Sequence, residues 1–293
     1  MDGLVAEAPR ARRFPLPSRG GELAALEFGP LERPLDLVFC HANGFNAQTY
    51  RTILGPLSAG LRILAIDLRG HGATALPTEL ENRQGWAAYR DDLLALLAFV
   101  AQGPVVVAGH SMGATTSLMA APHAQGVIRR LVLFDPVLMP ERGEPVPGDI
   151  AQSPMVQGAL RRRSQFASRE AAIAAYEGRG AFKTWSRAQI TDYVAAGFVD
   201  LEDGSVELAC APAWEASNFA VYDHQAWAAA LACPCPVKIL RAEHGSTCRI
   251  DDHIDTLLAT GRYEIETIPG SSHFLPMERP ELVRDVLTRA VSR

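Results

Sequence analysis

The chain has 293 residues, a mass of 31.6 kDa and a formal net charge of −5, with 48% hydrophobic and 21% charged residues. This composition is typical of a globular protein and is too apolar for a disordered one. The acidic balance argues against a nucleic-acid-binding protein, and no segment reaches the roughly 18 apolar residues of a membrane span.

The first half of the chain alternates short apolar segments with helical ones. The apolar segments predict strands at residues 22–28, 35–40, 61–68, 103–110 and 128–135. The segments between them predict helices at residues 47–57, 86–100 and 111–121. Strands that alternate with helices indicate an α/β fold with a mostly parallel sheet covered on both faces.

The alternation stops after the fifth strand and resumes near the C-terminus. Prolines and glycines predict a loop over residues 136–149, and residues 151–215 are expected to be helical with no strong strand. Strands are predicted again at 236–243 and 263–270, with helices at 223–232, 251–260 and 280–291. We therefore expect one discontinuous core, 1–136 and 216–293, and an inserted helical segment, 137–215.

One motif in this pattern indicates nucleophilic catalysis. Gly109-His110-Ser111-Met112-Gly113 follows an apolar strand and opens a helix. A serine on such a sharp turn is exposed above the sheet edge, and small residues two positions away on each side avoid clashes. The G-x-S-x-G spacing in this context predicts that Ser111 is a nucleophile.

Three further segments extend the pattern, and together with G-x-S-x-G they resemble the α/β-hydrolase fold family over nearly the whole chain. They are an oxyanion loop at 41–44, a D-x-R-G-H-G turn at 67–72 and a late histidine loop at 270–274. The resemblance implies an α/β-hydrolase fold, with a mostly parallel central sheet, helices on both faces, and residues 137–215 as a helical cap.

The resemblance also implies roles for the histidines. His273 lies in the Gly-Ser loop after the last strand and is expected to be the general base, because an imidazole titrates near the working pH. His41, His71 and His110 are expected to hold loop backbone through hydrogen bonds. His41 and His110 are also candidate substrate-binding residues.

Two backbone N–H groups are expected to stabilise an oxyanion. The first belongs to Met112, which follows the nucleophile, and the ungapped match of the loop assigns the second to Asn43. A shifted match would assign it to Phe45 instead. The side-chain amide of Asn43 could add a third donor or bind substrate.

The acid that orients His273 has more than one candidate. Gly245 occupies the position where the family most often has an aspartate. Asp135, at the end of the strand that follows the nucleophile helix, is the preferred candidate, and Glu243 is the alternative. Asp251 and Asp252 are the remaining candidates for this acid.

The inserted segment is expected to line the substrate pocket as a lid. Phe182 and Trp185 are the aromatic residues expected to bind substrate, within a larger group of candidates that also contains Phe166, Tyr193, Phe198 and Trp214.

These features together predict a serine hydrolase that cleaves a small-molecule carboxylic ester and needs no cofactor or metal. A carbon–carbon bond hydrolase, a lactonase or a thioesterase would use the same residues, and a non-catalytic small-molecule receptor on the same fold is the alternative from another class. No signal peptide is visible at the N-terminus, and five scattered cysteines are expected to be free thiols, so a cytoplasmic location is expected. The sequence predicts no oligomeric state.

Overall fold

The computed structural model describes residues 8–81, 83, 85–139, 152–221 and 225–292. Its core is an eight-stranded sheet in the order β1-β2-β4-β3-β5-β6-β10-β11. β1 and β2 are antiparallel to each other, β2 is antiparallel to β4, and the other neighbours are parallel. The expected mostly parallel α/β sheet is thus confirmed. The strands are β1 (Arg10–Leu16), β2 (Gly21–Phe28), β3 (Leu37–Cys40), β4 (Ile63–Ile66), β5 (Val105–His110), β6 (Ile128–Phe134), β10 (Val237–His244) and β11 (Tyr263–Ser272).

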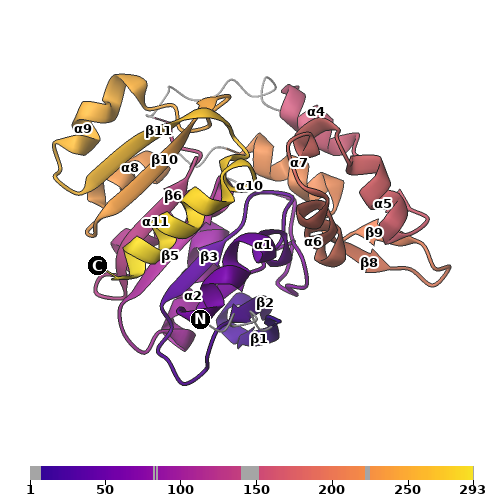
Figure 1. Ribbon diagram of the computed structural model, residues 1–293, viewed down its shortest axis with the longest axis horizontal. Coiled ribbons are helices and arrows are strands. Elements are labelled where there is room, and N and C mark those ends of the chain that lie inside the picture. Colours follow the sequence, from indigo (N-terminus) through magenta and orange to yellow (C-terminus); the bar gives the residue numbers. More distant parts are fainter. Residues whose placement is uncertain (1–7, 82, 84, 140–151, 222–224, 293) are drawn as a thin grey trace, which may run out of the picture.

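Helices cover both faces of this sheet (Figure 1). Successive side chains of a strand point to opposite faces, so Leu37 and Phe39 of β3 join one hydrophobic cluster while Val38 and Cys40 join the other. The first face is covered by α1 (Arg51–Leu54) and α11 (Pro280–Ser292). The second is covered by α2 (Ala87–Val100), α3 (Met112–Ala120), α8 (Gln225–Ala232) and α9 (Ile254–Leu258).

The core differs from the sequence prediction at two places. β1 was not predicted, because three of its seven residues are arginines, as befits an edge strand, and only Phe14 and Leu16 are buried. The helix predicted at 47–57 is divided into the 3₁₀ helix η2 (Ala47–Tyr50), α1 and the 3₁₀ helix η3 (Gly55–Ala59). Gly55 and Pro56 occur where α1 ends, and both residues disfavour a continuing α-helix. Three further 3₁₀ helices are η1 (Pro17–Arg19), η4 (Ala121–His123) and η6 (Asp251–His253).

The inserted segment forms a separate group of elements beside the core, on the right in Figure 1. Its helices are α4 (Pro154–Leu160), α5 (Arg169–Tyr176), the 3₁₀ helix η5 (Gly180–Phe182), α6 (Arg187–Gly197) and α7 (Pro212–Ala220). No strong strand is expected in this segment, and its three short strands, β7 (Gln165–Phe166), β9 (Val206–Leu208) and β8 (Phe198–Asp200), form an antiparallel sheet in that order. Strands of two or three residues are too short to show a periodicity of two.

One expected boundary of the inserted segment falls inside a helix. The predicted boundary between residues 215 and 216 falls inside α7, which packs with α4. Most of the loop predicted at 136–149 lies outside the described residues.

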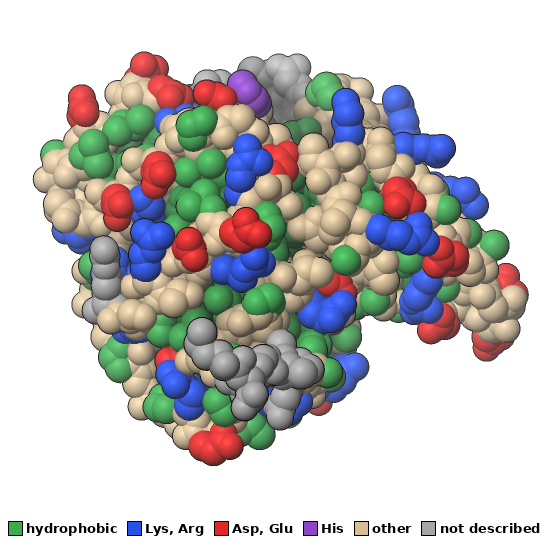
Figure 2. Space-filling model, in the orientation of Figure 1, with side chains coloured by type: hydrophobic (Ala, Val, Ile, Leu, Met, Phe, Trp, Pro, Cys, Tyr) green, Lys and Arg blue, Asp and Glu red, His purple; other side chains and the backbone are tan. Residues whose placement is uncertain are grey.

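The described part of the chain contains no helix that is both long and apolar enough to cross a bilayer. On the face shown in Figure 2, acidic and basic side chains are interspersed. All five cysteines are buried free thiols, and the described residues contain no cluster of three or more metal-binding side chains.

Candidate active site

Ser111 occupies the turn between β5 and α3. Its backbone is strained, with φ 53° and ψ −120°, a conformation that L-residues rarely adopt. The two glycines of the motif permit close packing around this turn. A Cβ atom on Gly109 would lie 2.6 Å from the backbone nitrogen of Ala114, and one on Gly113 would lie 2.3 Å from the carbonyl oxygen of Cys40. Only glycine therefore fits at both positions without movement of the backbone.

The structure links Ser111, His273 and Asp135 by a chain of two hydrogen bonds. The Ser111 Oγ atom lies 3.0 Å from Nε2 of His273. The Nδ1 atom of the same ring lies 2.6 Å from Oδ2 of Asp135. A carboxylate only accepts, so Nδ1 carries the proton and Nε2 is left free to accept one from the serine hydroxyl.

Asp135 is held by several donors at the end of β6. Its carboxylate accepts hydrogen bonds from the Ala242 amide at 2.9 Å, the Ser246 hydroxyl at 2.5 Å and the Thr247 amide at 3.0 Å. Burial raises the pKa of Asp135, but the bonds from His273, Ser246 and Ala242 outweigh it, so the pKa lies below its ordinary value. The side chain is therefore a buried, ionised acceptor directed at His273.

The other candidate acids do not approach the histidine ring. Glu243 accepts a hydrogen bond from the Gly270 amide at 2.8 Å and pairs with His244. Asp251 pairs with Arg241 at 2.9 Å, and Asp252 is exposed at the surface. Of the four candidates, the structure places Asp135 alone beside His273.

Two backbone N–H groups beside Ser111 are available as donors. Within the described part of the chain, neither the Met112 amide nor the Asn43 amide donates a hydrogen bond. The Phe45 amide, the donor in the shifted match, is bonded to the carbonyl oxygen of Ala42 at 3.1 Å. The geometry therefore favours Asn43 over Phe45.

The side-chain amide of Asn43 is engaged with α7. Its Nδ2 donates to the carbonyl oxygen of Glu215 at 3.0 Å, and its Oδ1 accepts from Asn218 at 2.7 Å. Both polar atoms of this amide hold the inserted segment against the loop, which gives the Asn43 side chain a positioning role.

His41 and His110 are fully buried and hydrogen-bonded within the core. His41 donates from Nδ1 to the carbonyl oxygen of Ala42 at 2.7 Å and accepts at Nε2 from the Leu68 amide at 2.9 Å. His110 contacts the Tyr50 hydroxyl at 2.8 Å and the carbonyl oxygen of His273 at 2.7 Å. Neither ring has a free nitrogen for substrate, so these two histidines position loop backbone and the expectation that they bind substrate is corrected.

Burial keeps these rings neutral. Desolvation, with repulsion from His273 as the next cause, lowers the pKa of His110 to about 3. Desolvation likewise lowers the pKa of His41 well below its usual range and that of His71 to about 4. Neutral rings can each donate from one nitrogen and accept at the other, which the loop contacts require.

Aromatic side chains of the inserted segment meet the two loops that flank Ser111. The Trp185 ring lies 5.2 Å from that of Phe45 and 6.2 Å from that of Phe274, the residue after His273. Phe182 lies 4.9 Å from Trp185, and the Tyr193 ring lies 5.8 Å from Phe45. Four rings thus surround the side chain of Trp185 next to the serine and histidine.

Three other aromatic candidates lie elsewhere. Phe166 and Phe198 pack on each other, 5.6 Å apart, within the small sheet. Trp214 donates its indole N–H to the carbonyl oxygen of Arg69 at 3.0 Å and belongs to the core cluster on the other face. The expectation that these three line the substrate pocket is not supported by their positions.

The sequence does not reveal the residues that hold Asp135 and His110 in place. Ser246 and Thr247 hold the carboxylate of Asp135, and Tyr50 holds His110, yet serine, threonine and tyrosine in these loops carry no distinctive spacing. The sequence singles out Phe45 only for its backbone amide, whereas in the structure its ring contacts Trp185.

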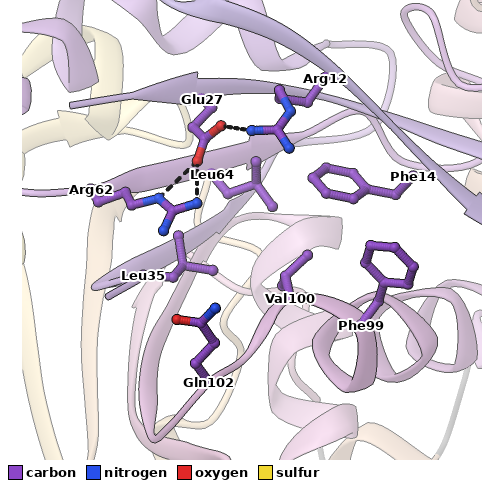
Figure 3. A pocket seen from close by; sticks show the side chains of 9 residues that line it. All are labelled: Arg12, Phe14, Glu27, Leu35, Arg62, Leu64, Phe99, Val100 and Gln102. Carbon is purple, nitrogen blue, oxygen red and sulfur yellow. Dashed lines mark hydrogen bonds and ion pairs between the residues drawn. The ribbon is translucent and has the colours of Figure 1, made fainter. Parts of the chain in front are cut away.

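A pocket of about 170 Å³ lies beside the edge strand β1 (Figure 3). It is lined by side chains of β1, β2, β4 and the end of α2, and Glu27 in its wall is paired with both Arg12 and Arg62. Ser111 and His273 are not among the lining residues, so this pocket is separate from the site described above.

Known proteins share parts of this sequence. The chain is 31% identical over 109 residues to 2-(acetamidomethylene)succinate hydrolase of Mesorhizobium japonicum, which is 36% of each chain. It is 30% identical over 133 residues to an esterase of Mycobacterium tuberculosis, which is 45% of this chain and 41% of the relative. The matches thus span about two fifths of the lengths of these relatives.

The fold and the sequence family agree with the site geometry. The crystal structure of E-2-(acetamidomethylene)succinate hydrolase superposes with a TM-score of 0.76 at 23% identity and covers 97% of this chain and 100% of that one, which shows the shared fold. Residues 37–286 match the alpha/beta hydrolase family, and this match covers most of the chain. The protein therefore belongs to the alpha/beta hydrolase family.

Proposed function

We propose that this protein is a serine hydrolase that cleaves a small-molecule carboxylic ester through an acyl-enzyme. The observation that carries the proposal is the continuous series from Ser111 Oγ through the His273 ring to the Asp135 carboxylate, at 3.0 and 2.6 Å. A serine hydroxyl becomes a strong nucleophile when a base accepts its proton, and this arrangement supplies the base and the group that orients it.

In the first half of the reaction, Ser111 Oγ attacks the ester carbonyl as its proton passes to Nε2 of His273. The carbonyl oxygen becomes an oxyanion that accepts hydrogen bonds from the free amides of Met112 and Asn43. When the tetrahedral intermediate collapses, the bond to the alcohol breaks and His273 returns the proton to the leaving oxygen. The acyl group remains on Ser111.

Water completes the cycle by the same steps. His273 accepts a proton from water as the water oxygen attacks the acyl-enzyme, and then returns it to Ser111 Oγ as the acid leaves. Asp135 keeps its charge throughout, consistent with its lowered pKa, and stabilises the imidazolium that forms in each half.

The inserted segment is proposed to act as the cap of this site. It contacts the core through Asn46, in the segment that follows the oxyanion loop, whose Nδ2 donates to the carbonyl oxygen of Tyr193 at 3.0 Å. An ion pair of 2.6 Å between Arg51 and Asp192 adds a second connection. A cap in this position excludes water from the acyl-enzyme and shapes the pocket for the substrate.

The choice of an ester as the substrate is supported by the apolar, aromatic surface beside Ser111 and by the esterase among the relatives. The relative from Mesorhizobium japonicum is named for a different substrate, and the same residues could cleave other acyl bonds.

The proposal is tested with p-nitrophenyl butyrate. The wild-type protein is expected to release p-nitrophenol, and Ser111→Ala is expected to lose at least about four orders of magnitude in kcat, because the nucleophile is gone. Full activity in Ser111→Ala would contradict the mechanism. Saturable binding of esters, lactones and thioesters without turnover of any of them would instead indicate a receptor.

A further inference from the structure

We propose that the indole N–H of Trp185 donates a hydrogen bond to a second oxygen of the substrate, a neutral carbonyl in the acyl chain beyond the bond that is cleaved. This inference rests on the proposed function and narrows its substrate class. It assigns Trp185 a specificity role that apolar packing alone would not give.

Trp185 is held firmly between the two loops of the active site. It lies between η5 and α6, and α6 is tied to the core on both sides of Ser111. On one side, Asn46 donates to the carbonyl oxygen of Tyr193, and on the other, Gln189 donates to the carbonyl oxygen of Met277, each at 3.0 Å. The indole is therefore fixed in place before any substrate arrives.

The indole N–H of Trp185 is a buried donor without an acceptor. The side chain is only 6% exposed, and no hydrogen-bond partner for Nε1 is found among the described residues. By contrast, the indoles of Trp86 and Trp214 donate to backbone carbonyl oxygens at 3.2 and 3.0 Å. Buried N–H groups are almost always paired, so an unpaired one that packs on Phe45 and on Phe274, the residue after His273, points to a ligand that pairs it.

A second unpaired polar atom lies further along the same group of rings. The Tyr176 ring stacks on Phe182 at 4.5 Å, and its buried hydroxyl also has no partner in the part of the chain described. Aromatic faces accept hydrogen bonds only weakly, so the surrounding rings do not replace an oxygen acceptor.

The surroundings favour a neutral acceptor over a carboxylate. Arg162 is hydrogen-bonded to Tyr193 in this group of rings, but it is already paired with Glu215 at 2.5 Å. A carboxylate buried among aromatic rings without a free cation would be costly. A ketone, ester or amide carbonyl can accept the same hydrogen bond without that cost.

The position of Trp185 favours the acyl side of the substrate. His273 protonates the leaving oxygen, so the leaving group must lie beside the histidine loop. The Trp185 ring is nearer to Phe45 of the oxyanion loop, at 5.2 Å, than to Phe274 of the histidine loop, at 6.2 Å. The ring thus lies nearer the oxyanion loop than the histidine loop, and we assign the indole donor to the acyl side of the substrate.

The test compares p-nitrophenyl levulinate with p-nitrophenyl valerate, two esters of equal chain length of which only the first carries a ketone. Trp185→Phe keeps an aromatic ring and removes the N–H. We expect it to lower the ratio of kcat/KM for levulinate to kcat/KM for valerate about fivefold to tenfold, as the loss of one neutral hydrogen bond predicts. The ratio cancels any general loss of activity caused by altered packing.

Trp227→Phe is the matched control, because Trp227 lies on α8 in the cluster on the other face of the sheet. The ratio is expected to stay at the wild-type value in this variant. An unchanged ratio in folded Trp185→Phe would overturn the inference while leaving the serine mechanism intact. Full activity in Ser111→Ala would instead overturn the proposed function.

A second measurement covers the case in which Trp185→Phe does not fold. The indole N–H signals of the four tryptophans are followed by ¹⁵N NMR in Ser111→Ala, with Trp185 assigned by elimination after single replacement of the other three. Bound p-nitrophenyl levulinate is expected to shift the Trp185 indole proton downfield relative to bound p-nitrophenyl valerate. Equal shifts with the two esters would overturn the inference.

Discussion

The imidazole of His110 donates a hydrogen bond from Nε2 to the backbone carbonyl oxygen of His273 at 2.7 Å. A carbonyl oxygen only accepts, so Nε2 carries the proton and Nδ1 accepts from the hydroxyl of Tyr50 at 2.8 Å. That hydroxyl also accepts from the Ala42 amide at 3.2 Å. One buried series of hydrogen bonds therefore links the oxyanion loop, the residue before the nucleophile and the histidine loop.

Tyr50→Phe interrupts this series without removing the ring. It leaves Nδ1 of His110 without a donor and the Ala42 amide without an acceptor, both in the core. We expect a loss of about 1–3 kcal/mol in the free energy of unfolding and a fall of about tenfold in kcat, with KM changed less than about twofold. Urea unfolding and steady-state kinetics on p-nitrophenyl butyrate measure the two effects.

Tyr263→Phe is the matched control for this positioning role. Tyr263 donates to the carbonyl oxygen of Ala230 at 2.6 Å and begins β11, whereas His273 follows the end of that strand. It should lose stability of the same order and retain kcat. Equal losses of kcat in the two variants would mean that Tyr50 acts only through stability.

Asp135→Asn tests the assignment of the acid. An amide at this position cannot accept the Nδ1 proton of His273 and keep all its other donors, so the ring would lose the tautomer that the reaction needs. We expect kcat to fall by roughly three to four orders of magnitude. Glu243→Gln should retain kcat, because Glu243 is bonded to the Gly270 amide and not to the histidine. A near-wild-type kcat in Asp135→Asn would refute the assignment.

The buried histidines predict a loss of stability in mild acid. His41, His71 and His110 have pKa values lowered by burial, to about 4 for His71 and about 3 for His110, so at pH 5 they are neutral when folded and protonated when unfolded. The unfolded state then binds more protons, and the free energy of unfolding falls as the pH falls. Burial raises the pKa of Asp67 to about 6, which acts in the opposite direction over the same range.

The net expected change is a decrease of at least about 2 kcal/mol in the free energy of unfolding between pH 7 and pH 5, from His71 and His110 offset by Asp67, with His41 acting in the same direction as the other two histidines. Urea unfolding at the two pH values measures it. His71→Gln should reduce this difference by roughly 2 kcal/mol, because it removes one of the three titrating rings. Equal stability at pH 7 and pH 5 in the wild-type protein would contradict the prediction.

The sequence by itself determined the α/β order of the core and the positions of Ser111 and His273. These features are local: apolar strands, helical periodicity and the small residues of a sharp turn are visible within a few consecutive positions. The cap sheet was missed for the same reason, since its strands of two and three residues are too short to show a pattern.

Only the tertiary structure decided which acid faces His273, because Asp135 and Glu243 both lie at the ends of strands and the sequence could only make Asp135 the preferred candidate. The ends of β6, β10 and β11 meet at one edge of the sheet, and donors 107 to 112 residues away in the chain hold Asp135 toward the ring. The tertiary structure also decided that the side-chain amide of Asn43 is hydrogen-bonded and that the indole N–H of Trp185 is unpaired among the described residues. Both outcomes depend on contacts between the inserted segment and the core. Such contacts join residues far apart in sequence, so no local pattern records them.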